Sequence, residues 1–280
     1  MPLICFASPK GGVGKTTLSA NVADLLRREG RSVVALDLDP QNSLRLHFGM
    51  PVAEQEGFMA HLSRRPDWRG YLRQAASGTL VLPHGGISLR GALDNATALE
   101  REPDLLTAPL RDMLADPRIV VVADMPPGPS QALSLLMPMA SLLVTVLRSE
   151  AISAAMLAEI EAGRFLGTGT MKALFAGRLQ FVLNGVDLRD RLSRMTAEAV
   201  ARHLGSRLLG AISQDEAVGT ALAAQRLLSE ASPASPAARD LRQLAMAIEA
   251  SLPAPVAHAA SSDRVEQPTA AWAAPQWGTR

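Results

Sequence analysis

The 280-residue sequence contains a single cysteine, Cys5, and few aromatic residues, which make up 4% of the chain. One cysteine excludes an intramolecular disulfide framework and a zinc site built from several cysteines of one chain. The shortage of aromatic side chains argues against a surface on which nucleic-acid bases stack. Neither sign of charge is in excess, because 28 Lys and Arg stand against 27 Asp and Glu, and a formal charge of +1 argues against a protein that coats DNA.

Sequence signals for export or membrane insertion are also missing. The apolar run at 3–7 is too short for an export signal, lacks a basic region before it and enters a glycine-rich loop directly. The uncharged stretch Met125–Leu147 contains four prolines and a glycine, which would break a membrane-spanning helix repeatedly. We expect a loop, a short helix and a buried strand there, in a soluble cytoplasmic protein.

Short apolar runs alternate with helical patterns along most of the chain. The run Ile-Val-Val-Val at 119–122 is the clearest, since unbroken β-branched residues are typical of a strand buried on both faces of a parallel sheet. Strand–helix alternation of this kind predicts an α/β fold with a doubly wound, mostly parallel sheet and helices on both faces. Strands are predicted at 3–8, 32–38, 80–82, 119–124, 142–147, 179–183 and 208–212. Helices are predicted at 16–29, 54–64, 104–115, 151–166, 189–204 and 237–252.

The sequence divides into one domain, residues 1–252, and a C-terminal tail, residues 253–280, of a different composition. The tail contains eight alanines and four prolines but no Leu, Ile, Met or Phe. Such a segment cannot bury enough apolar surface to offset the entropy of ordering it, so we expect it to be disordered. Its two tryptophans, Trp272 and Trp277, are either exposed residues of that tail or anchors of a short docking peptide.

A glycine-rich segment, Pro9–Thr17, follows the first predicted strand and opens the first predicted helix, as a phosphate-binding loop requires. Glycines let backbone N–H groups turn toward phosphate oxygens, and the helix adds the positive end of its dipole. Lys15 would reach the outer phosphates, the Thr16 hydroxyl would ligate Mg²⁺ and the Thr17 hydroxyl would bond an inner phosphate. The loop residues predicted to bind nucleotide are Lys10, Gly11, Gly12, Val13, Gly14, Lys15, Thr16 and Thr17.

Carboxylates end two of the other predicted strands. Asp37 and Asp39 are two residues apart and therefore point to the same side, toward the mouth of the loop. A carboxylate there can hold the attacking water or a magnesium-bound water; the alternative is that both residues merely end a strand or cap a turn. Asp124 ends an apolar strand and, behind a phosphate loop, is predicted to bind Mg²⁺ through water. The five histidines, His47 among them, have no ligand-like spacing, so we predict no metal site built on them.

The loop sequence Lys-Gly-Gly-Val-Gly-Lys-Thr at 10–16 resembles the deviant Walker A motif of the MinD/ParA ATPases, and the resemblance covers roughly residues 1–252. It implies ATP and Mg²⁺ as cofactors and a homodimer with nucleotide between two chains. In that dimer Lys10 would reach the partner's phosphates, so that hydrolysis needs two copies. The residues alone also allow Lys10 to be a local phosphate contact.

The same resemblance assigns roles to three further residues. The segment Asp37–Asn42 is similar to the family's Asp-x-Asp-Pro-Gln block, which implies that Asp39 orients the lytic water and that Asp37 belongs to the switch I neighbourhood. Asn184 follows a predicted strand where family members read the adenine edge, and an amide offers both the donor and the acceptor for that task. The alternative for Asn184 is a turn residue, since Asn-Gly is a common turn former.

Three short blocks resemble a narrower group, the BcsQ (YhjQ) proteins, which are MinD-like ATPases encoded with bacterial cellulose synthase. The blocks are Ser43–Gly49, Asp67–Arg69 and Leu80–Gly85. This resemblance implies an ATPase that assembles or positions the cellulose synthase complex at the inner membrane, with subunits of that complex as partners. We expect the membrane contact to be indirect, because the tail lacks the apolar helical stripe that anchors MinD-type division regulators.

The alternative is a ParA-type ATPase that partitions DNA or another cargo through surface arginines and lysines. The candidate arginines lie in and near one predicted helix: Arg189, Arg191, Arg194, Arg202 and Arg207. Three carboxylates partly offset them: Asp187, Asp190 and Glu198. We therefore expect an ordinary solvated helix face there and no nucleic-acid partner.

Overall fold

The computed structural model describes residues 2–161 and 177–252. The strands in these ranges are β1 (Leu3–Ala7), β2 (Ser32–Asp37), β3 (Arg73–Gln74), β4 (Leu80–Leu82), β5 (Ile119–Asp124), β6 (Leu142–Arg148), β7 (Leu179–Val186) and β8 (Leu208–Ser213). They form one sheet in the order β3-β4-β2-β5-β1-β6-β7-β8. All neighbours are parallel except β3 and β4, so the carboxyl ends of the central strands share one edge.

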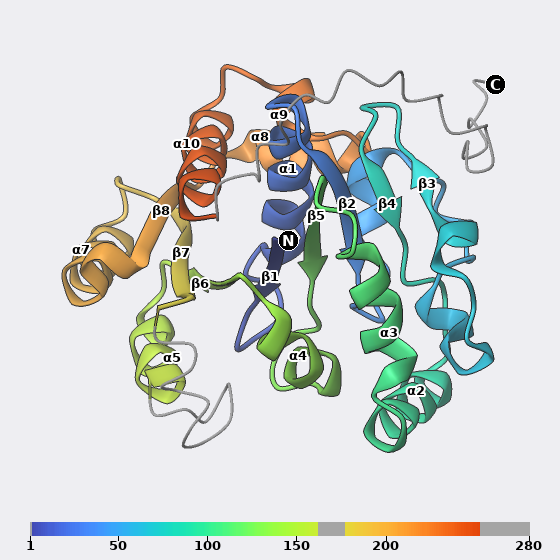
Figure 1. Ribbon diagram of the computed structural model, residues 1–280. Coiled ribbons are helices and arrows are strands. Elements are labelled where there is room, and N and C mark those ends of the chain that lie inside the picture. The colour runs from blue at the N-terminus through green and yellow to red at the C-terminus, as the bar shows by residue number, and fades with distance from the viewer. Residues whose placement is uncertain (1, 162–176, 253–280) are drawn as a thin grey trace, which may run out of the picture.

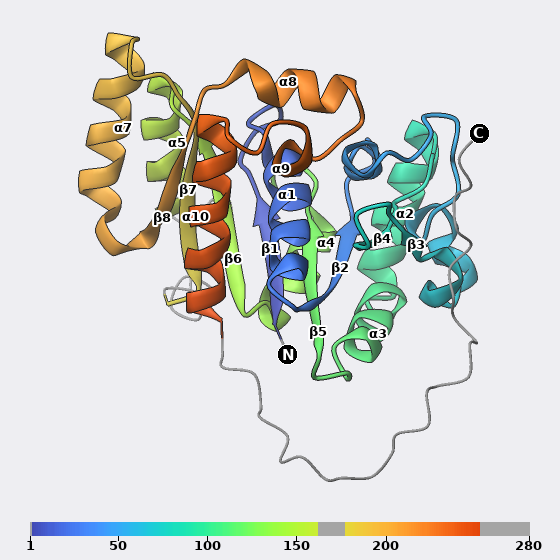
Figure 2. The ribbon, with the colours of Figure 1, turned by 90° about the horizontal axis from the view of Figure 1, so that it is seen from above.

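Helices cover both faces of this sheet. The α-helices in the described ranges are α1 (Lys15–Arg28), α2 (Leu89–Arg101), α3 (Asp104–Met113), α4 (Gln131–Leu136), α5 (Ala151–Glu161), α7 (Arg191–Leu204), α8 (Glu216–Ala223), α9 (Leu228–Ala231) and α10 (Pro236–Ser251). Short 3-10 helices are η1 (Leu44–Phe48), η2 (Met59–Arg64), η3 (Trp68–Tyr71), η4 (Met137–Met139) and η5 (Gly205–Arg207). Figure 1 shows α1, α9 and α10 above the sheet and α3, α4 and α5 below it, and Figure 2 shows the upper layer from above.

Side chains of the central strands alternate between two apolar cores. In β1, Leu3 and Cys5 belong to the core shared with α2–α5 and α7, whereas Ile4 and Phe6 belong to the core shared with α1 and α8–α10. All four side chains are fully buried. Burial on both faces accounts for the unbroken apolar run of β5, and the predicted doubly wound α/β fold is confirmed.

The predicted strands are all present, with ends that differ by at most three residues. The stretch Met125–Leu147 forms a loop, the short helices α4 and η4 and most of β6, as expected. No helix in the described part of the chain is long and apolar enough to cross a membrane. The sequence patterns did not predict α2, α8 or α9. The predicted tail at 253–280 lies outside the described residues, as does the end of the helix predicted at 151–166.

The helix predicted at 54–64 is wrong in its first half, because helical structure begins only with η2. The preceding residues run beside the loop after β4, where the Phe58 N–H donates to the Pro83 carbonyl oxygen at 2.9 Å. A Cβ added to Gly57 would lie 2.1 Å from the Gly85 nitrogen. Glycine therefore allows two backbones to touch here, and that tertiary contact overrides the local helical pattern.

Candidate functional site

The glycine-rich loop lies between β1 and α1 at the carboxyl edge of the sheet. Gly12 and Gly14 have φ angles of 74° and 88°, in the left-handed region that favours glycine. Gly14 is the N-cap residue of α1, so the amino end of the helix directly follows the loop. A cavity of about 290 Å³ opens at this point, and we call it the loop cavity. Its lining residues are Ser8, Gly11, Gly12, Val13, Gly14, Lys15, Thr16, Thr17, Asp39, Gln41, Ser43, Leu46, His47, Pro127 and Leu222.

Four of the predicted site residues, from three parts of the chain, meet beside the loop cavity. The Lys15 Nζ atom lies 2.8 Å from Asp124 Oδ1 and 3.6 Å from Asp39 Oδ2. The Thr16 hydroxyl donates to Asp124 Oδ2 at 2.7 Å. The two aspartates and Lys15 are buried, so their charges interact where water screens them weakly. The structure thus brings these four residues together, and the roles predicted for them stay predictions.

Asp37 lies in the interior, outside the lining of the loop cavity. Its carboxylate oxygens accept hydrogen bonds from the backbone N–H groups of Asp39, at 3.0 Å, and of Leu44, at 3.1 Å. Complete burial, and next the nearby Asp124 carboxylate, raise the pKa of Asp37 well above its ordinary value. The side chain therefore fixes the backbone that positions Asp39.

The oxygen atoms in this cluster suit a hard divalent cation. Thr16 and Asp124 bring a hydroxyl and a carboxylate together, and oxygen ligands are those that Mg²⁺ prefers. In residues 2–161 and 177–252 no group of three or more His, Cys, Asp or Glu side chains could hold a metal ion by itself. A magnesium ion here would therefore depend on phosphate and water oxygens as well. Ser19, which was not predicted, donates to Asp124 Oδ1 at 2.9 Å from one helical turn after Lys15.

Lys10 lies apart from this cluster, at the rim of the loop. Its Nζ atom lies 2.7 Å from Glu150 Oε2, and Glu150 Oε1 lies 2.9 Å from Arg148 Nε. The Lys10 side chain is 34% exposed, whereas that of Lys15 is 6% exposed. The charge of Lys10 is therefore accessible from outside the chain. Glu150 was not predicted, and the available signal was its position two residues after the end of an apolar strand.

Asn184 contacts the loop from β7. Its Nδ2 atom donates to the Val13 carbonyl oxygen at 2.7 Å. A Cβ on Gly14 would lie 2.2 Å from the same Nδ2 atom, so a side chain at Gly14 would displace this contact. Asn184 supports the loop backbone here, and the adenine contact that the resemblance implies for it stays a prediction.

Comparison with known proteins places this site in a family. The family described as "Cellulose biosynthesis protein BcsQ" matches residues 1–248. The chain belongs to the BcsQ family. The BcsQ protein of Escherichia coli K12 is 32% identical to it over 89 residues, which are 32% of this chain and span 36% of that relative. The chromosome-partitioning ATPase Soj of Thermus thermophilus is 29% identical over 251 residues, which are 86% of this chain and 93% of Soj.

Solved structures show the same fold. The septum site-determining protein MinD of Pyrococcus horikoshii, solved in complex with Mg-ADP, matches with a TM-score of 0.69 at 20% identity. The match covers 89% of this chain and 96% of that MinD chain. This BcsQ-family chain is therefore a MinD/ParA-type nucleotide-binding ATPase in fold and family, as the loop sequence predicted.

Two of the sequence blocks that resemble BcsQ make contacts between elements far apart in the chain. Trp68 Nε1 donates to Asp112 Oδ2 at 2.8 Å, and the Arg69 guanidinium carbon lies 4.4 Å from the centre of the Trp68 ring. These contacts join η3 to α3. The Gly85 N–H donates to Asn42 Oδ1 at 3.2 Å, which joins the loop after β4 to the segment after β2. The second of these contacts reaches the segment that follows Asp39.

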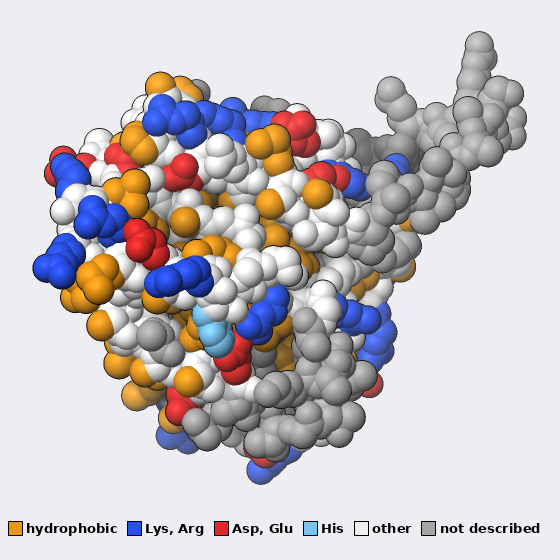
Figure 3. All heavy atoms as spheres, turned by 90° about the vertical axis from the view of Figure 1, so that its left-hand side faces the viewer, with side chains coloured by type: hydrophobic (Ala, Val, Ile, Leu, Met, Phe, Trp, Pro, Cys, Tyr) orange, Lys and Arg blue, Asp and Glu red, His pale blue; other side chains and the backbone are white. Residues whose placement is uncertain are grey.

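The arginines that a nucleic-acid surface would need lie on and around α7, on the side of the molecule shown in Figure 3. Arg189 Nε lies 3.1 Å from Asp187 Oδ1, and Arg207 Nη2 lies 2.7 Å from Glu161 Oε1. Basic side chains on this side are interleaved with acidic and apolar ones (Figure 3). This face of the BcsQ-family chain is mixed in charge rather than continuously basic.

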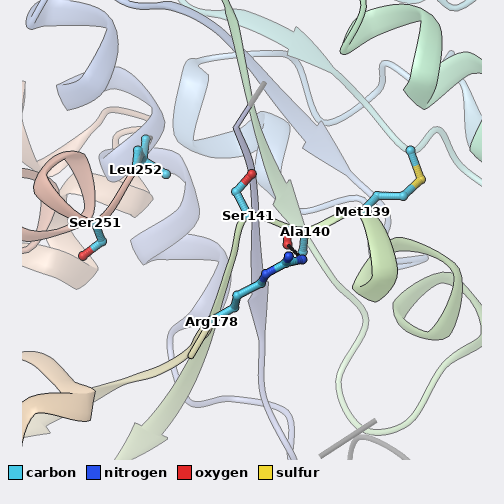
Figure 4. Close-up of a pocket in the computed structure, with 6 residues that line it drawn as sticks. All are labelled: Met139, Ala140, Ser141, Arg178, Ser251 and Leu252. Carbon is cyan, nitrogen blue, oxygen red and sulfur yellow. Dashed lines mark hydrogen bonds between the residues drawn. The ribbon is translucent and has the colours of Figure 1, made fainter. Parts of the chain in front are cut away.

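A second cavity, of about 540 Å³, lies at the opposite edge of the sheet, where β6 and β7 begin. Its lining residues are Met139, Ala140, Ser141, Arg178, Ser251 and Leu252 (Figure 4). Arg178 is the one charged side chain among them, and its Nη1 atom donates to the Ala140 carbonyl oxygen at 3.2 Å. Ligands of open α/β sheets bind at the carboxyl ends of the strands, so the loop cavity, rather than this one, is the candidate nucleotide site.

Proposed function

We propose that this chain hydrolyses ATP and uses the reaction to assemble or position the bacterial cellulose synthase and secretion complex. The observation that carries the proposal is the meeting of Lys15, Thr16, Asp39 and Asp124 at a phosphate loop in a chain of the BcsQ family. In this proposal the protein works in the cytoplasm and reaches the inner membrane through subunits of that complex.

In this proposal each of these residues has a task that its position allows. Lys15 has three N–H donors, so it can keep Asp39 as a neighbour while donating to phosphate oxygens in the loop cavity. Backbone N–H groups around Gly12 and Gly14 supply the rest of the anion cradle. Asp39 holds the attacking water, and its position is fixed by Asp37 through the bond to its backbone N–H. Mg²⁺, held by Thr16 and through water by Asp124, would neutralise charge on the phosphates.

The rim of the loop supports a homodimer. Lys10 is half-exposed and is paired with Glu150 rather than with the carboxylates beside the loop cavity. A second chain that approaches this rim could accept the Lys10 ammonium on its own nucleotide phosphates. Hydrolysis would then require two copies, and the dimer would last as long as ATP stays intact.

The decisive experiment is an affinity purification from detergent-solubilised native cells. The bait is Asp39→Ala, which should bind Mg-ATP without hydrolysing it and so keep the dimer. The matched control is Lys15→Ala, which should bind no nucleotide. Cellulose synthase subunits, identified by mass spectrometry and enriched only with the Asp39→Ala bait, are the expected result. Equal recovery with both baits would contradict control by ATP, and recovery of no such subunit would contradict the proposed partner.

The second candidate is partitioning of DNA or another cargo. The likeness to Soj over most of both chains favours it, because Soj is a chromosome-partitioning ATPase. Chromosomal DNA or a ParB-like adaptor recovered with the Asp39→Ala bait would support this alternative over the cellulose complex.

A further inference from the structure

His47 lines the loop cavity together with Lys15, Thr16 and Asp39. Its side chain is almost completely enclosed, because the residue is 4% exposed. Within the described residues its imidazole has neither a hydrogen-bond partner nor an ion-pair partner. The ring nitrogens are not among the fully buried polar atoms that lack a partner, so they remain open to a group that enters from outside. A mostly enclosed imidazole without a partner at the wall of a cavity is therefore placed to contact a ligand in that cavity.

The element that carries His47 is fixed on several sides. Leu44 and Phe48, at the two ends of η1, are buried in the core shared with α1. The Leu44 N–H donates to Asp37, and the Arg45 guanidinium donates to the carbonyl oxygens of Pro51 and Val52. The imidazole is thus presented to the cavity by a rigid support, which is what a precise polar contact requires.

The chemistry of the imidazole restricts its partner. Burial lowers the pKa of His47 to about 4, so the ring is neutral at physiological pH and has one N–H donor and one acceptor nitrogen. Phosphate oxygens are acceptors only. In a cavity lined by a phosphate loop and Lys15, the natural partner of the ring N–H is a phosphate oxygen.

We propose that His47 is a nucleotide-contacting residue whose ring N–H donates to a phosphate oxygen of the nucleotide in the loop cavity. This proposal rests on the nucleotide site described above. It adds a contact from η1 to those of the loop itself.

The test compares His47→Leu and His47→Gln with the unaltered full-length chain. Leucine fills most of the volume without polar atoms, whereas glutamine restores an N–H donor. The affinities for Mg²⁺-bound fluorescent ATP and ADP are measured by titration, and the unfolding midpoint is measured without nucleotide. A hydrogen bond to a charged group corresponds to a change of roughly tenfold or more in the dissociation constant. We expect that loss in His47→Leu, with most of it recovered in His47→Gln.

Stability separates a ligand contact from a packing role. Replacing an unpaired buried imidazole by leucine should leave the unfolding midpoint equal or higher, while the affinity falls. Affinity in His47→Leu within about twofold of the unaltered chain would overturn the proposal. If His47→Leu does not fold, His47→Gln decides, because affinity near that of the unaltered chain supports the contact and loss as deep as that of Lys15→Ala overturns it.

Two controls isolate the inference from the proposed function. His61→Leu changes a histidine outside the loop cavity, paired with Glu56 at 3.0 Å, and should leave the affinity unchanged. Lys15→Ala should lose binding altogether. If Lys15→Ala binds as tightly as the unaltered chain, the nucleotide site itself is misassigned. If Lys15→Ala loses binding and His47→Leu does not, only the role of His47 fails.

Discussion

The two lysines of the phosphate loop lie in opposite surroundings. Lys15 is buried between Asp124 and Asp39, where a charge pair is weakly screened. Lys10 pairs with Glu150, whose side chain is 45% exposed, and such pairs contribute roughly 0–1 kcal/mol to stability. The loop therefore has an inner lysine whose charge is held by two buried carboxylates and an outer lysine whose charge is partly accessible to another molecule.

The strongest test of this comparison is the stability of two matched variants. Lys15→Met leaves Asp124 and Asp39 buried without their cation, and breaking a buried pair costs about 3 kcal/mol or more in the free energy of unfolding. Lys10→Met removes a half-exposed pair and should change that free energy by less than about 1 kcal/mol. Urea denaturation of the nucleotide-free proteins measures both. Equal losses in the two variants would remove the distinction between the lysines.

The inner cluster is the part of the site that the sequence predicts best. Parallel strands end at a common edge, so Asp39 and Asp124 could be placed beside the loop from strand ends alone. The period of two along a strand predicted that Asp37 and Asp39 both point toward the mouth of the loop, which is wrong for Asp37, because its side chain lies in the interior. That outcome depends on the N–H groups of Asp39 and Leu44, which turn toward its carboxylate only after the chain leaves β2.

The second test concerns function at the outer lysine. Lys10→Ala should keep the affinity for Mg-ATP within about threefold, because the inner cluster is intact, while losing at least tenfold in both ATP-dependent dimerisation and turnover. Light scattering coupled to size-exclusion chromatography measures the dimer, and phosphate release measures turnover. Lys10→Arg is the matched control that retains the charge. Normal dimerisation and turnover in Lys10→Ala would show that the cross-subunit role is wrong.

The contact of the outer lysine, Lys10, with Glu150 was harder to predict, because it joins distant parts of the chain. Lys10 and Glu150 are 140 residues apart and meet because β6 is the neighbour of β1 in the sheet, which the order of the strands along the chain does not reveal. His47 has no ligand-like spacing to the other histidines, so its sequence position alone did not predict a place beside the loop cavity. The position of the His47 side chain follows from the packing of η1 against α1. Because η1 is a short 3-10 segment with no clear periodic pattern, the sequence does not predict that packing.

The smallest expected effect comes from the partner of the outer lysine. Glu150 holds the Lys10 ammonium at 2.7 Å, and that contact has to open before the lysine can reach a second chain. Glu150→Gln removes the charge but keeps the shape, so dimerisation should need about two- to fivefold less Mg-ATP, in line with the energy of an exposed ion pair. The gain should shrink as salt rises, because salt screens exposed pairs in the unaltered chain. Analytical ultracentrifugation at two salt concentrations measures both effects. Weaker dimerisation in Glu150→Gln would mean that Glu150 itself contacts the second chain, and the outer pair would then be part of the interface rather than a restraint on it.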